Sequence, residues 1–250
     1  MSSKWIQRSY KRTPLPWLIR NGVSRRDVIQ RCIDARNART YLEIGVSDGR
    51  VFAAMKAPTR IGVDPIAPAP LVVAELGKPG VAYVSRTSDS FFETEAPRLL
   101  PDGVDVVFID GLHTWAQAYR DCLNSLAYLN PGGIILLHDC LPRNEGQALV
   151  ARSPQEAAAL AEAQGVPFDW AWTGDVWRAI VALRQHPDLS TFVLDCDRGV
   201  GVVRRGANEG GPRLSEADIA TLRFADLKAR AGELLGLRKP YHLVKALASS

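Results

Sequence analysis

Apolar residues recur along the chain in two alternating patterns through its first three fifths. Short runs rich in Val, Ile and Leu, without alternation, predict β-strands that are covered on both faces. Five such runs stand at 40–46, 60–65, 81–87, 104–111 and 132–139. Segments with apolar residues three or four positions apart predict helices at 24–38, 50–57, 90–100 and 114–129. Strands that alternate with helices indicate a parallel sheet wrapped by helices.

After Pro142 the pattern changes. Helices are predicted at 154–165 and 175–186, and a last amphipathic helix at 215–235, after a loop rich in Gly and Pro. Between them, 191–205 reads as two short strands joined at DRG, an antiparallel hairpin that can complete the sheet edge. We therefore predict an α/β fold: a Rossmann-like, doubly wound, mostly parallel seven-stranded sheet with a C-terminal antiparallel hairpin and helices on both faces.

Composition agrees with a globular protein, because 250 residues with 46% apolar content can bury a sizeable core. No apolar run approaches the roughly 18 residues that cross a bilayer, and the N-terminus lacks the apolar stretch of a secretory signal. We expect a cytoplasmic protein without a membrane partner. The four cysteines have no CxxC spacing, so we expect reduced, mostly buried thiols rather than a zinc site or disulfides.

The net charge of +4 is concentrated near the N-terminus, where seven Lys and Arg residues fall within 4–26. A basic arm of this kind suits nucleic acid, but no nucleic-acid-binding motif accompanies it, so we do not expect that partner. The same arm carries Trp5, Tyr10 and Trp17. It could fold over a site as a lid or contact a second subunit in a homo-oligomer, and the sequence leaves both open.

A glycine-containing loop, YLEIGVSDGRVF, joins the first strand to the segment that follows. In a doubly wound sheet, ligands bind beyond the carboxyl ends of the strands, which is where this loop should lie. Gly45 and Gly49 would let the backbone approach a ligand closely. The pattern is E-x-G-x-x-x-G rather than the G-x-G-x-x-G of dinucleotide folds. It resembles the Rossmann-like, class I methyltransferases, whose cofactor is S-adenosyl-L-methionine.

Further residues follow from this resemblance. Asp64 ends the second strand, where a carboxylate can accept both ribose hydroxyls, although an aspartate before proline also forms turns. By resemblance Ser88 and Asp89 occupy the adenine corner, and Ser88 could instead cap the next helix. Glu43, Gly45 and Ser47 are expected near the methionine portion, although Glu43 could do no more than orient the loop. Asp110 is expected beside the sulfonium, and Gly49 is a further expected cofactor-binding residue.

Two predicted strands end on the same pair of side chains. VDVVFIDGLHTW presents Asp110 and His113, and PGGIILLHDCLP presents His138 and Asp139. If these strands are neighbours, the two carboxylates come together beside the cofactor, and like charges repel unless a cation lies between them. Carboxylate oxygens suit a hard cation such as Mg²⁺. Asp110 could also bond backbone amides and Asp139 could cap a turn.

The stretches FIDGLHTWAQAYRD and LNPGGIILLHDC resemble the divalent-metal O-methyltransferases, in particular the macrolide-sugar, TylF-like and cephalosporin-hydroxylase-like group, over about residues 40–142. The resemblance implies metal ligands Asp110 and Asp139 and a general base at His113. Many relatives carry an acidic or amide residue beside the second aspartate, whereas here His138 and Cys140 flank Asp139. Because neighbouring strand residues alternate faces, we expect His138 to point into the sheet.

These patterns divide the chain into a basic arm and helix at 1–38, a methyltransferase domain at 39–206 and a helical extension at 207–250. The acceptor would be the hydroxyl of a small molecule, a sugar or other natural product that can be glycosylated. Trp170, Trp172 and Trp177 could stack on it or pack in the core. A metal-independent O- or N-methyltransferase is the alternative; a nicotinamide dehydrogenase lacks its middle glycine, and a non-catalytic scaffold would not need the converging acids.

Overall fold

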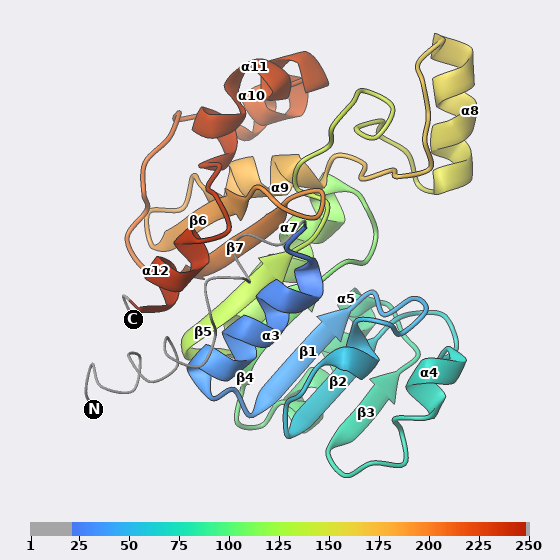
Figure 1. The fold of residues 1–250 in the computed structure, drawn as a ribbon, viewed down its shortest axis with the longest axis vertical. Helices are drawn as coiled ribbons and strands as arrows, with labels where there is room; N and C mark the ends of the chain where they lie inside the picture. The colour runs from blue at the N-terminus through green and yellow to red at the C-terminus, as the bar shows by residue number, and fades with distance from the viewer. Residues whose placement is uncertain (1–21, 249–250) are drawn as a thin grey trace.

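The structure, a computed structural model, describes residues 22–248; the predicted arm with Trp5, Tyr10 and Trp17 lies outside them. In this part of the chain one sheet has the strand order β3-β2-β1-β4-β5-β7-β6 (Figure 1). The strands are β1 (Thr40–Ile44), β2 (Thr59–Val63), β3 (Val81–Val84), β4 (Val104–Ile109), β5 (Leu129–Leu137), β6 (Leu189–Leu194) and β7 (Val200–Arg205).

The first five strands are parallel, and β7 pairs antiparallel with both β5 and β6. The predicted fold class, a Rossmann-like sheet with an antiparallel hairpin at one edge, is therefore confirmed. The chain winds outward from β1 through β2 to β3, then returns to β4 on the other side of β1. This reversal creates a crevice at the carboxyl ends of β1 and β4, where doubly wound folds bind their ligands.

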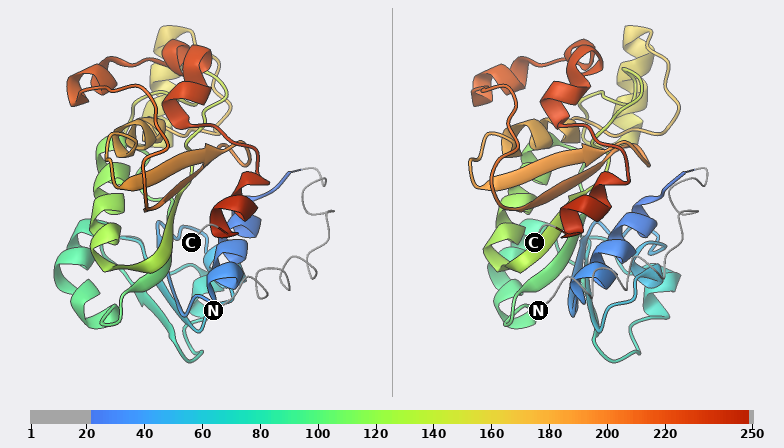
Figure 2. Two further views of the ribbon diagram at one scale, coloured as in Figure 1. Left: turned by 90° about the vertical axis from the view of Figure 1, so that its left-hand side faces the viewer. Right: turned by 60° about the vertical axis from the view of Figure 1, so that its left-hand side comes forward.

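Helices cover both faces of the sheet (Figure 2). One face holds α5 (Ser88–Thr94), α6 (Ala96–Leu99), α7 (Trp115–Tyr128), α9 (Val176–Leu183), α10 (Glu216–Thr221) and α11 (Phe224–Leu235). The other holds α3 (Arg25–Arg36), the short 3-10 helix η1 (Phe52–Ala54), α4 (Pro70–Val73) and α12 (His242–Ala248). Along β4, Val107 and Ile109 join the first core while Val106 and Phe108 join the second, as the alternation of side chains in a strand requires.

Three predicted helices differ from the structure. The helix predicted at 50–57 is only the turn η1, because Met55 already has extended backbone, with φ −74° and ψ 141°. The helix predicted at 90–100 begins at Ser88 and is divided at Glu95 into α5 and α6. The helix predicted at 215–235 is divided into α10 and α11, because Arg223 has extended backbone and caps the second helix together with Asp226.

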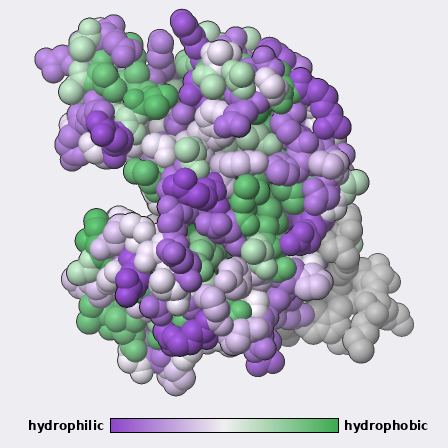
Figure 3. Space-filling view, turned by 180° about the vertical axis from the view of Figure 1, so that it is seen from behind, coloured by the Kyte–Doolittle hydropathy of each residue, from purple (hydrophilic) through white to green (hydrophobic). Residues whose placement is uncertain are grey.

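A segment at 141–175 stands apart from the sheet and carries α8 (Pro154–Gln164), seen at the upper right of Figure 1. It has its own small apolar cluster, which includes Leu149, Ala157 and Trp172. In the space-filling view a hollow separates the part that carries α8 from the part that carries β3 and α4 (Figure 3). The carboxyl ends of β1 and β2 point toward this side of the molecule in Figure 1.

Candidate active site

A cavity of about 640 Å³ lies at the crevice, within the range of roughly 300–1,000 Å³ that is usual for small-molecule sites. Its wall includes most of the residues predicted from the sequence: Glu43, Gly45, Ser47, Asp64, Ser88, Asp89, Asp110, His113 and Asp139. Gly49 does not line it and instead contacts Val72 of α4. The cavity therefore joins the predicted nucleoside residues to the acid cluster in one space.

The loop after β1 is tied to the end of β4. Gly45 has φ +83°, and a Cβ there would lie 2.2 Å from the carbonyl oxygen of Asp110, so only glycine fits. The sequence indicated that Gly45 lets a ligand approach the backbone. The structure shows that it also lets the backbone after β4 approach. Ser47, also in the left-handed region with φ +49°, donates its backbone N–H to Asp64 Oδ2 over 2.9 Å.

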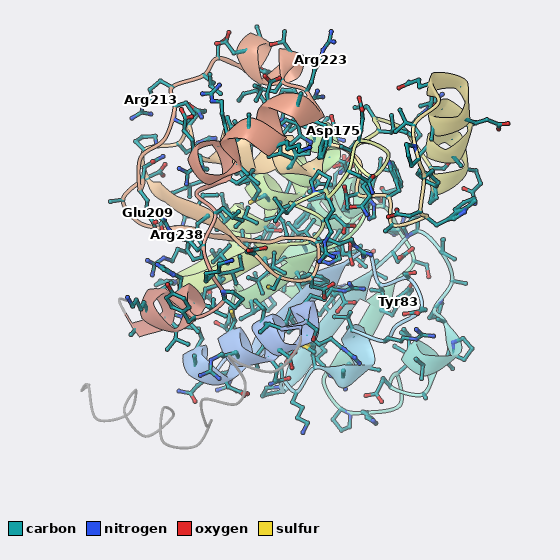
Figure 4. The ribbon with its side chains drawn as sticks, turned by 45° about the horizontal axis from the view of Figure 1, so that its top comes forward. Tyr83, Asp175, Glu209, Arg213, Arg223 and Arg238 are labelled. Carbon is teal, nitrogen blue, oxygen red and sulfur yellow. The ribbon has the colours of Figure 1, made fainter. Side chains whose placement is uncertain are left out.

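Asp64 is 7% exposed and accepts backbone N–H groups from Ser47 and Ile66. Asp64 thus has the turn-forming role. Because a carboxylate has about four lone-pair positions, it can accept further hydrogen bonds from a ligand in the cavity. Tyr83 of β3, labelled in Figure 4, donates its hydroxyl to the carbonyl of Ile66 over 2.8 Å and holds this edge of the cavity in place.

At the predicted adenine corner, the cap of α5 is Thr87, whose hydroxyl accepts the N–H of Ser90, and Ser88 is the first helical residue. Ser88 is buried and its hydroxyl accepts a hydrogen bond from Gln117 of α7 over 3.2 Å. Sequence reasoning missed Gln117, because a helix position gives no sign of which cavity its face will meet.

Glu43 lies on β1, is 1% exposed and accepts a hydrogen bond from the hydroxyl of Tyr41. Burial in this apolar strand raises the pKa of Glu43 to about 8, although the bond from Tyr41 acts in the opposite direction. Glu43 is therefore largely protonated near neutral pH and can both donate and accept.

The carboxyl ends of β4 and β5 bring the predicted acid cluster together. His113 Nε2 lies 3.6 Å from Asp110 Oδ1 and 3.3 Å from Asp139 Oδ2. One ligand-type atom from each of the three residues falls within 4.8 Å of the others. Asp139 Oδ2 is buried and accepts no hydrogen bond in the described part of the chain. The sequence-based expectation that these strand ends meet agrees with this geometry.

The orientation of His113 is set by the segment at 141–175. Its Nδ1 lies 3.1 Å from the carbonyl oxygen of Trp172, which can only accept, so Nδ1 carries a proton. In the neutral ring the lone pair is then on Nε2 and faces the two carboxylates. Asp175, labelled in Figure 4 and located just before α9, accepts the backbone N–H of Trp115 over 2.7 Å, which ties the same segment to the start of α7.

His138 was expected to point into the sheet, and this is wrong. Its ring is buried, and Nδ1 lies 3.2 Å from an oxygen of Asp110 and 3.2 Å from an oxygen of Asp139. Strand alternation does not apply here, because β5 ends at Leu137 and Asp139 has φ +58°. The ring of His138 therefore contacts both carboxylates, although Asp139 lines the cavity and His138 does not.

Sequence reasoning also missed Arg25, Asp197 and Arg198. Arg198, in the turn between β6 and β7, donates from Nε to Asp139 Oδ1 over 2.8 Å. Arg25, the first residue of α3, donates its backbone N–H to Asp197 over 2.7 Å and places Nε 3.8 Å from Asp110 Oδ2. The sequence DRG predicted only a hairpin turn. Its neighbouring residues do not indicate that Arg198 contacts Asp139, which is 59 residues earlier in the chain.

These contacts control the ionisation of the cluster. Burial is the largest single effect and would raise the pKa of Asp110 and of Asp139, but His138 and His113 together outweigh it and hold both below their ordinary values. Conversely, burial would lower the pKa of His113 and of His138, and the two carboxylates raise both. The site therefore holds carboxylates as anions close to imidazoles that bind protons readily.

The three predicted acceptor-side tryptophans have different environments. Trp177, on α9, is 1% exposed in the core, and Trp172 is 6% exposed with its ring 5.1 Å from that of His113. Trp170 is 65% exposed and packs edge-on against Phe168. Of the three, Trp170 alone is exposed, and it does not line the cavity.

Comparison with known proteins bears on this site. Residues 42–140 match the family described as Methyltransferase domain. The matched stretch contains the glycine loop, Asp64 and the acid cluster. An uncharacterized protein of Acanthamoeba polyphaga mimivirus is 32% identical over 114 residues, which cover 40% of this chain and 51% of that protein. The chain thus spans about half the length of this curated relative.

Solved structures share the fold at low identity. A protein from Staphylococcus aureus, provisionally described as a caffeoyl-CoA O-methyltransferase, is 16% identical with a TM-score of 0.50, covering 82% of this chain and 93% of its own. A cofactor-bound protein from MTB is 17% identical with a TM-score of 0.51, covering 80% of this chain and 86% of its own.

Among residues 22–248, no helix combines the length and apolar character that crossing a bilayer requires.

Proposed function

We propose that this protein transfers a methyl group from S-adenosylmethionine to a hydroxyl group of a small-molecule acceptor. The observation that carries the proposal is the single cavity that joins Asp64 and the glycine loop to Asp110, His113 and Asp139. The family match over residues 42–140 supports methyl transfer, and the activity named for the Staphylococcus aureus protein supports oxygen as the receiving atom. A sugar or other natural product, free or glycosylated, is the acceptor class we propose.

His113 is the proposed general base. Its Nδ1–H is fixed on the carbonyl of Trp172, so its Nε2 lone pair is aimed at the space between the carboxylates. There it takes the proton of the acceptor hydroxyl as the oxygen–carbon bond forms. The sulfonium of S-adenosylmethionine, when bound, supplies the methyl group and leaves as a neutral thioether. Asp110 and Asp139 stabilise the imidazolium that results, because both lie within about 4 Å of Nε2.

The acid cluster also fits a divalent cation. Asp139 Oδ2 is buried and accepts no hydrogen bond from residues 22–248, and carboxylate oxygens of Asp110 and Asp139 lie within 4.8 Å of each other, which gives the hard donor set that Mg²⁺ prefers. We propose that Asp110 and Asp139 hold the ion. When bound, it would lower the pKa of a coordinated acceptor hydroxyl. Residues 39–206 would form the catalytic domain in this proposal.

A metal-independent reaction is the second candidate, and one observation favours it. Arg25, Arg198 and His138 already place positive charge against the three carboxylates of Asp110, Asp139 and Asp197. These internal cations reduce the repulsion that would otherwise call for a metal ion.

Two experiments test the proposal. Calorimetric titration with S-adenosylhomocysteine and with NAD should show binding of the first only, and binding of NAD alone would contradict methyl transfer. Methyl transfer to a panel of hydroxylated compounds should be lost in EDTA and restored by Mg²⁺. Activity that survives both EDTA and Asp139→Ala would remove the metal and leave the metal-independent reaction.

A further inference from the structure

The turn between β6 and β7 carries a guanidinium whose hydrogen-bond donors are mostly unused. Arg198 lines the cavity, and its side chain is 33% exposed. Its Nε donates to Asp139 Oδ1 over 2.8 Å, and within residues 22–248 neither of its two Nη nitrogens donates a hydrogen bond. Pairs of arginine and carboxylate are frequently bidentate, whereas this pair uses one N–H of the five that a guanidinium offers. The contact with Asp139 therefore leaves the outer edge of the guanidinium free.

The backbone of the turn fixes Arg198 in this position. Arg198 has left-handed backbone, with φ +60°. Its carbonyl oxygen accepts the N–H of Leu141 over 2.7 Å, and the carbonyl oxygen of Gly199 accepts the N–H of Cys140 over 3.1 Å. These two bonds tie the turn to the chain that follows β5. The guanidinium is thus held in the cavity wall before a ligand binds.

Asp139 places this guanidinium beside the proposed base. The two oxygens of its carboxylate have different partners, since Oδ1 accepts from Arg198 and Oδ2 lies 3.3 Å from His113 Nε2. Because both partners line the cavity and contact one carboxylate, a ligand only a few atoms long can reach both. In the sheet, β1 and β4 separate β5 from β2, so this is the end of the cavity away from Asp64.

The charges at this end of the cavity are compatible with an anionic ligand. Two guanidinium groups, those of Arg25 and Arg198, face the carboxylates of Asp110, Asp139 and Asp197. A sulfonium, when bound, adds one positive charge and balances this set. The proposed divalent cation would add two more. An anionic group on the acceptor would therefore not be repelled without the cation, and would be attracted with it.

We propose that Arg198 binds a carboxylate of the methyl acceptor, which makes the acceptor a hydroxy acid. This inference rests on the proposed function and narrows its acceptor class. The two Nη nitrogens present a planar pair of N–H donors that matches the two oxygens of a carboxylate. With the carboxylate at Arg198 and the hydroxyl at His113 Nε2, the two groups of the acceptor stand only a few bonds apart. Arg198 is thus a specificity-determining residue.

The test compares acids with their neutral amides, which are close to them in size. Titration calorimetry on the full chain, saturated with S-adenosylhomocysteine and Mg²⁺, measures lactate, mandelate, 2-hydroxybenzoate and 3-hydroxybenzoate beside the corresponding amides. At least one acid should bind about 10- to 100-fold more tightly than its amide, the size expected for hydrogen bonds between charged groups.

Two variants of Arg198 distinguish a contact from a general effect of charge. Arg198→Gln should reduce the ratio of acid to amide affinity to within about threefold. Arg198→Lys should do the same although it keeps the charge, because Asp139 occupies its single nitrogen. Affinity for S-adenosylhomocysteine should stay within about threefold in both. Loss of a merely structural ion pair would weaken acid and amide alike and leave the ratio unchanged.

Arg50→Gln is the matched control. Arg50 also pairs with an aspartate of the cavity wall, Asp48, but its own side chain is 76% exposed and lies outside the wall. The variant removes the same charge without removing a proposed contact, so the ratio of acid to amide affinity should not change.

Four results decide against the inference. If no acid binds the unaltered protein more tightly than its amide, Arg198 does not select hydroxy acids, while binding of S-adenosylhomocysteine still supports the proposed function. A ratio that is retained in folded Arg198→Lys shows an effect of charge without contact. A large loss of S-adenosylhomocysteine affinity in Arg198→Gln assigns the guanidinium to the cofactor instead. Failure of the unaltered protein to bind S-adenosylhomocysteine removes the proposed function and this inference together.

Discussion

Half of the non-glycine residues with left-handed backbone in residues 22–248 line the cavity, whereas Asn37, Trp170 and Asp197 do not. Among the described residues, Ser47, Asp139 and Arg198 have φ of +49°, +58° and +60°, and all three line it. Side chains other than glycine rarely occupy this region, and each instance costs on the order of 1–3 kcal/mol unless its surroundings compensate. Here the compensation is visible, since Arg198 bonds Asp139 and Ser47 bonds Asp64. Strain of this kind is typical of sites that must hold polar groups in fixed positions.

His113 gives the first prediction at the residue scale. His113→Asn should lower kcat for methyl transfer by about 10²- to 10⁴-fold, the usual contribution of a general base. Affinity for S-adenosylhomocysteine should stay within about threefold, because Nε2 faces the carboxylates rather than the nucleoside residues.

The same variant distinguishes a base from a metal ligand. Titration with Mg²⁺ should give an unchanged affinity if His113 acts only as a base. A large loss of Mg²⁺ affinity would instead identify His113 as a ligand. Full turnover in the variant would remove the histidine from the chemistry.

At the scale of elements, the segment at 141–175 reaches the site through its backbone. The carbonyl of Trp172 orients His113, and Gly174 packs against the carbonyl of His113 so closely that a Cβ would stand 1.8 Å from the oxygen. A substitution that disturbs this contact should therefore lower both the thermal stability and the activity. The segment itself carries none of the proposed proton-transfer or metal-binding groups.

Gly174→Ala tests this coupling. The substitution should displace His113 and lower kcat by at least about tenfold, since misplacement by about 1 Å can cost 10²-fold. Gly165→Ala is the matched control: it ends α8 in the same segment with φ +66°, but a Cβ there meets nothing within 4 Å. Both variants carry the cost of an alanine at positive φ, so thermal unfolding should drop in both, whereas turnover should fall only in Gly174→Ala. Equal turnover in the two variants would contradict the coupling.

At the scale of the whole molecule, the buried Glu43 links stability to pH. Its pKa in the folded protein, about 8, lies above the ordinary value of 4.5. Between pH 4.5 and 8 the unfolded chain releases the proton of Glu43, whereas the folded protein keeps it. The contribution of Glu43 to the free energy of unfolding is therefore fully present below pH 4.5 and is lost as the pH rises through 8. The free energy of unfolding should decrease over this range by up to about 1.4 kcal/mol per pH unit.

Glu43→Gln provides the comparison, since glutamine keeps the size and the acceptor for Tyr41 but does not titrate. Urea unfolding at several pH values between 5 and 8 should show a flatter dependence in the variant, which becomes the more stable protein toward pH 8. Parallel curves for the two proteins would show that Glu43 does not titrate in this range.

The sequence by itself determined the fold class and the outline of the site. Uninterrupted apolar runs specified the parallel strands, because a strand buried on both faces tolerates few polar residues. The positions of Asp64, Asp110 and Asp139 at strand ends then followed from topology, since parallel neighbours end at the same edge. The start of the helix predicted from residue 24 was also determined locally, because Ser24 caps α3 together with Asp27, only three residues away.

Only the tertiary structure decided which distant groups complete the site. Arg25, Gln117, Asp121 and Arg198 come from two helices and a hairpin turn, and their sequence neighbourhoods are those of ordinary surface residues. His138 was misjudged because the left-handed backbone of Asp139 ends the alternation of the strand. Side-chain direction at strand ends depends on contacts made across the sheet. A linear pattern of apolar and polar residues does not contain those contacts, whereas the packed chain does.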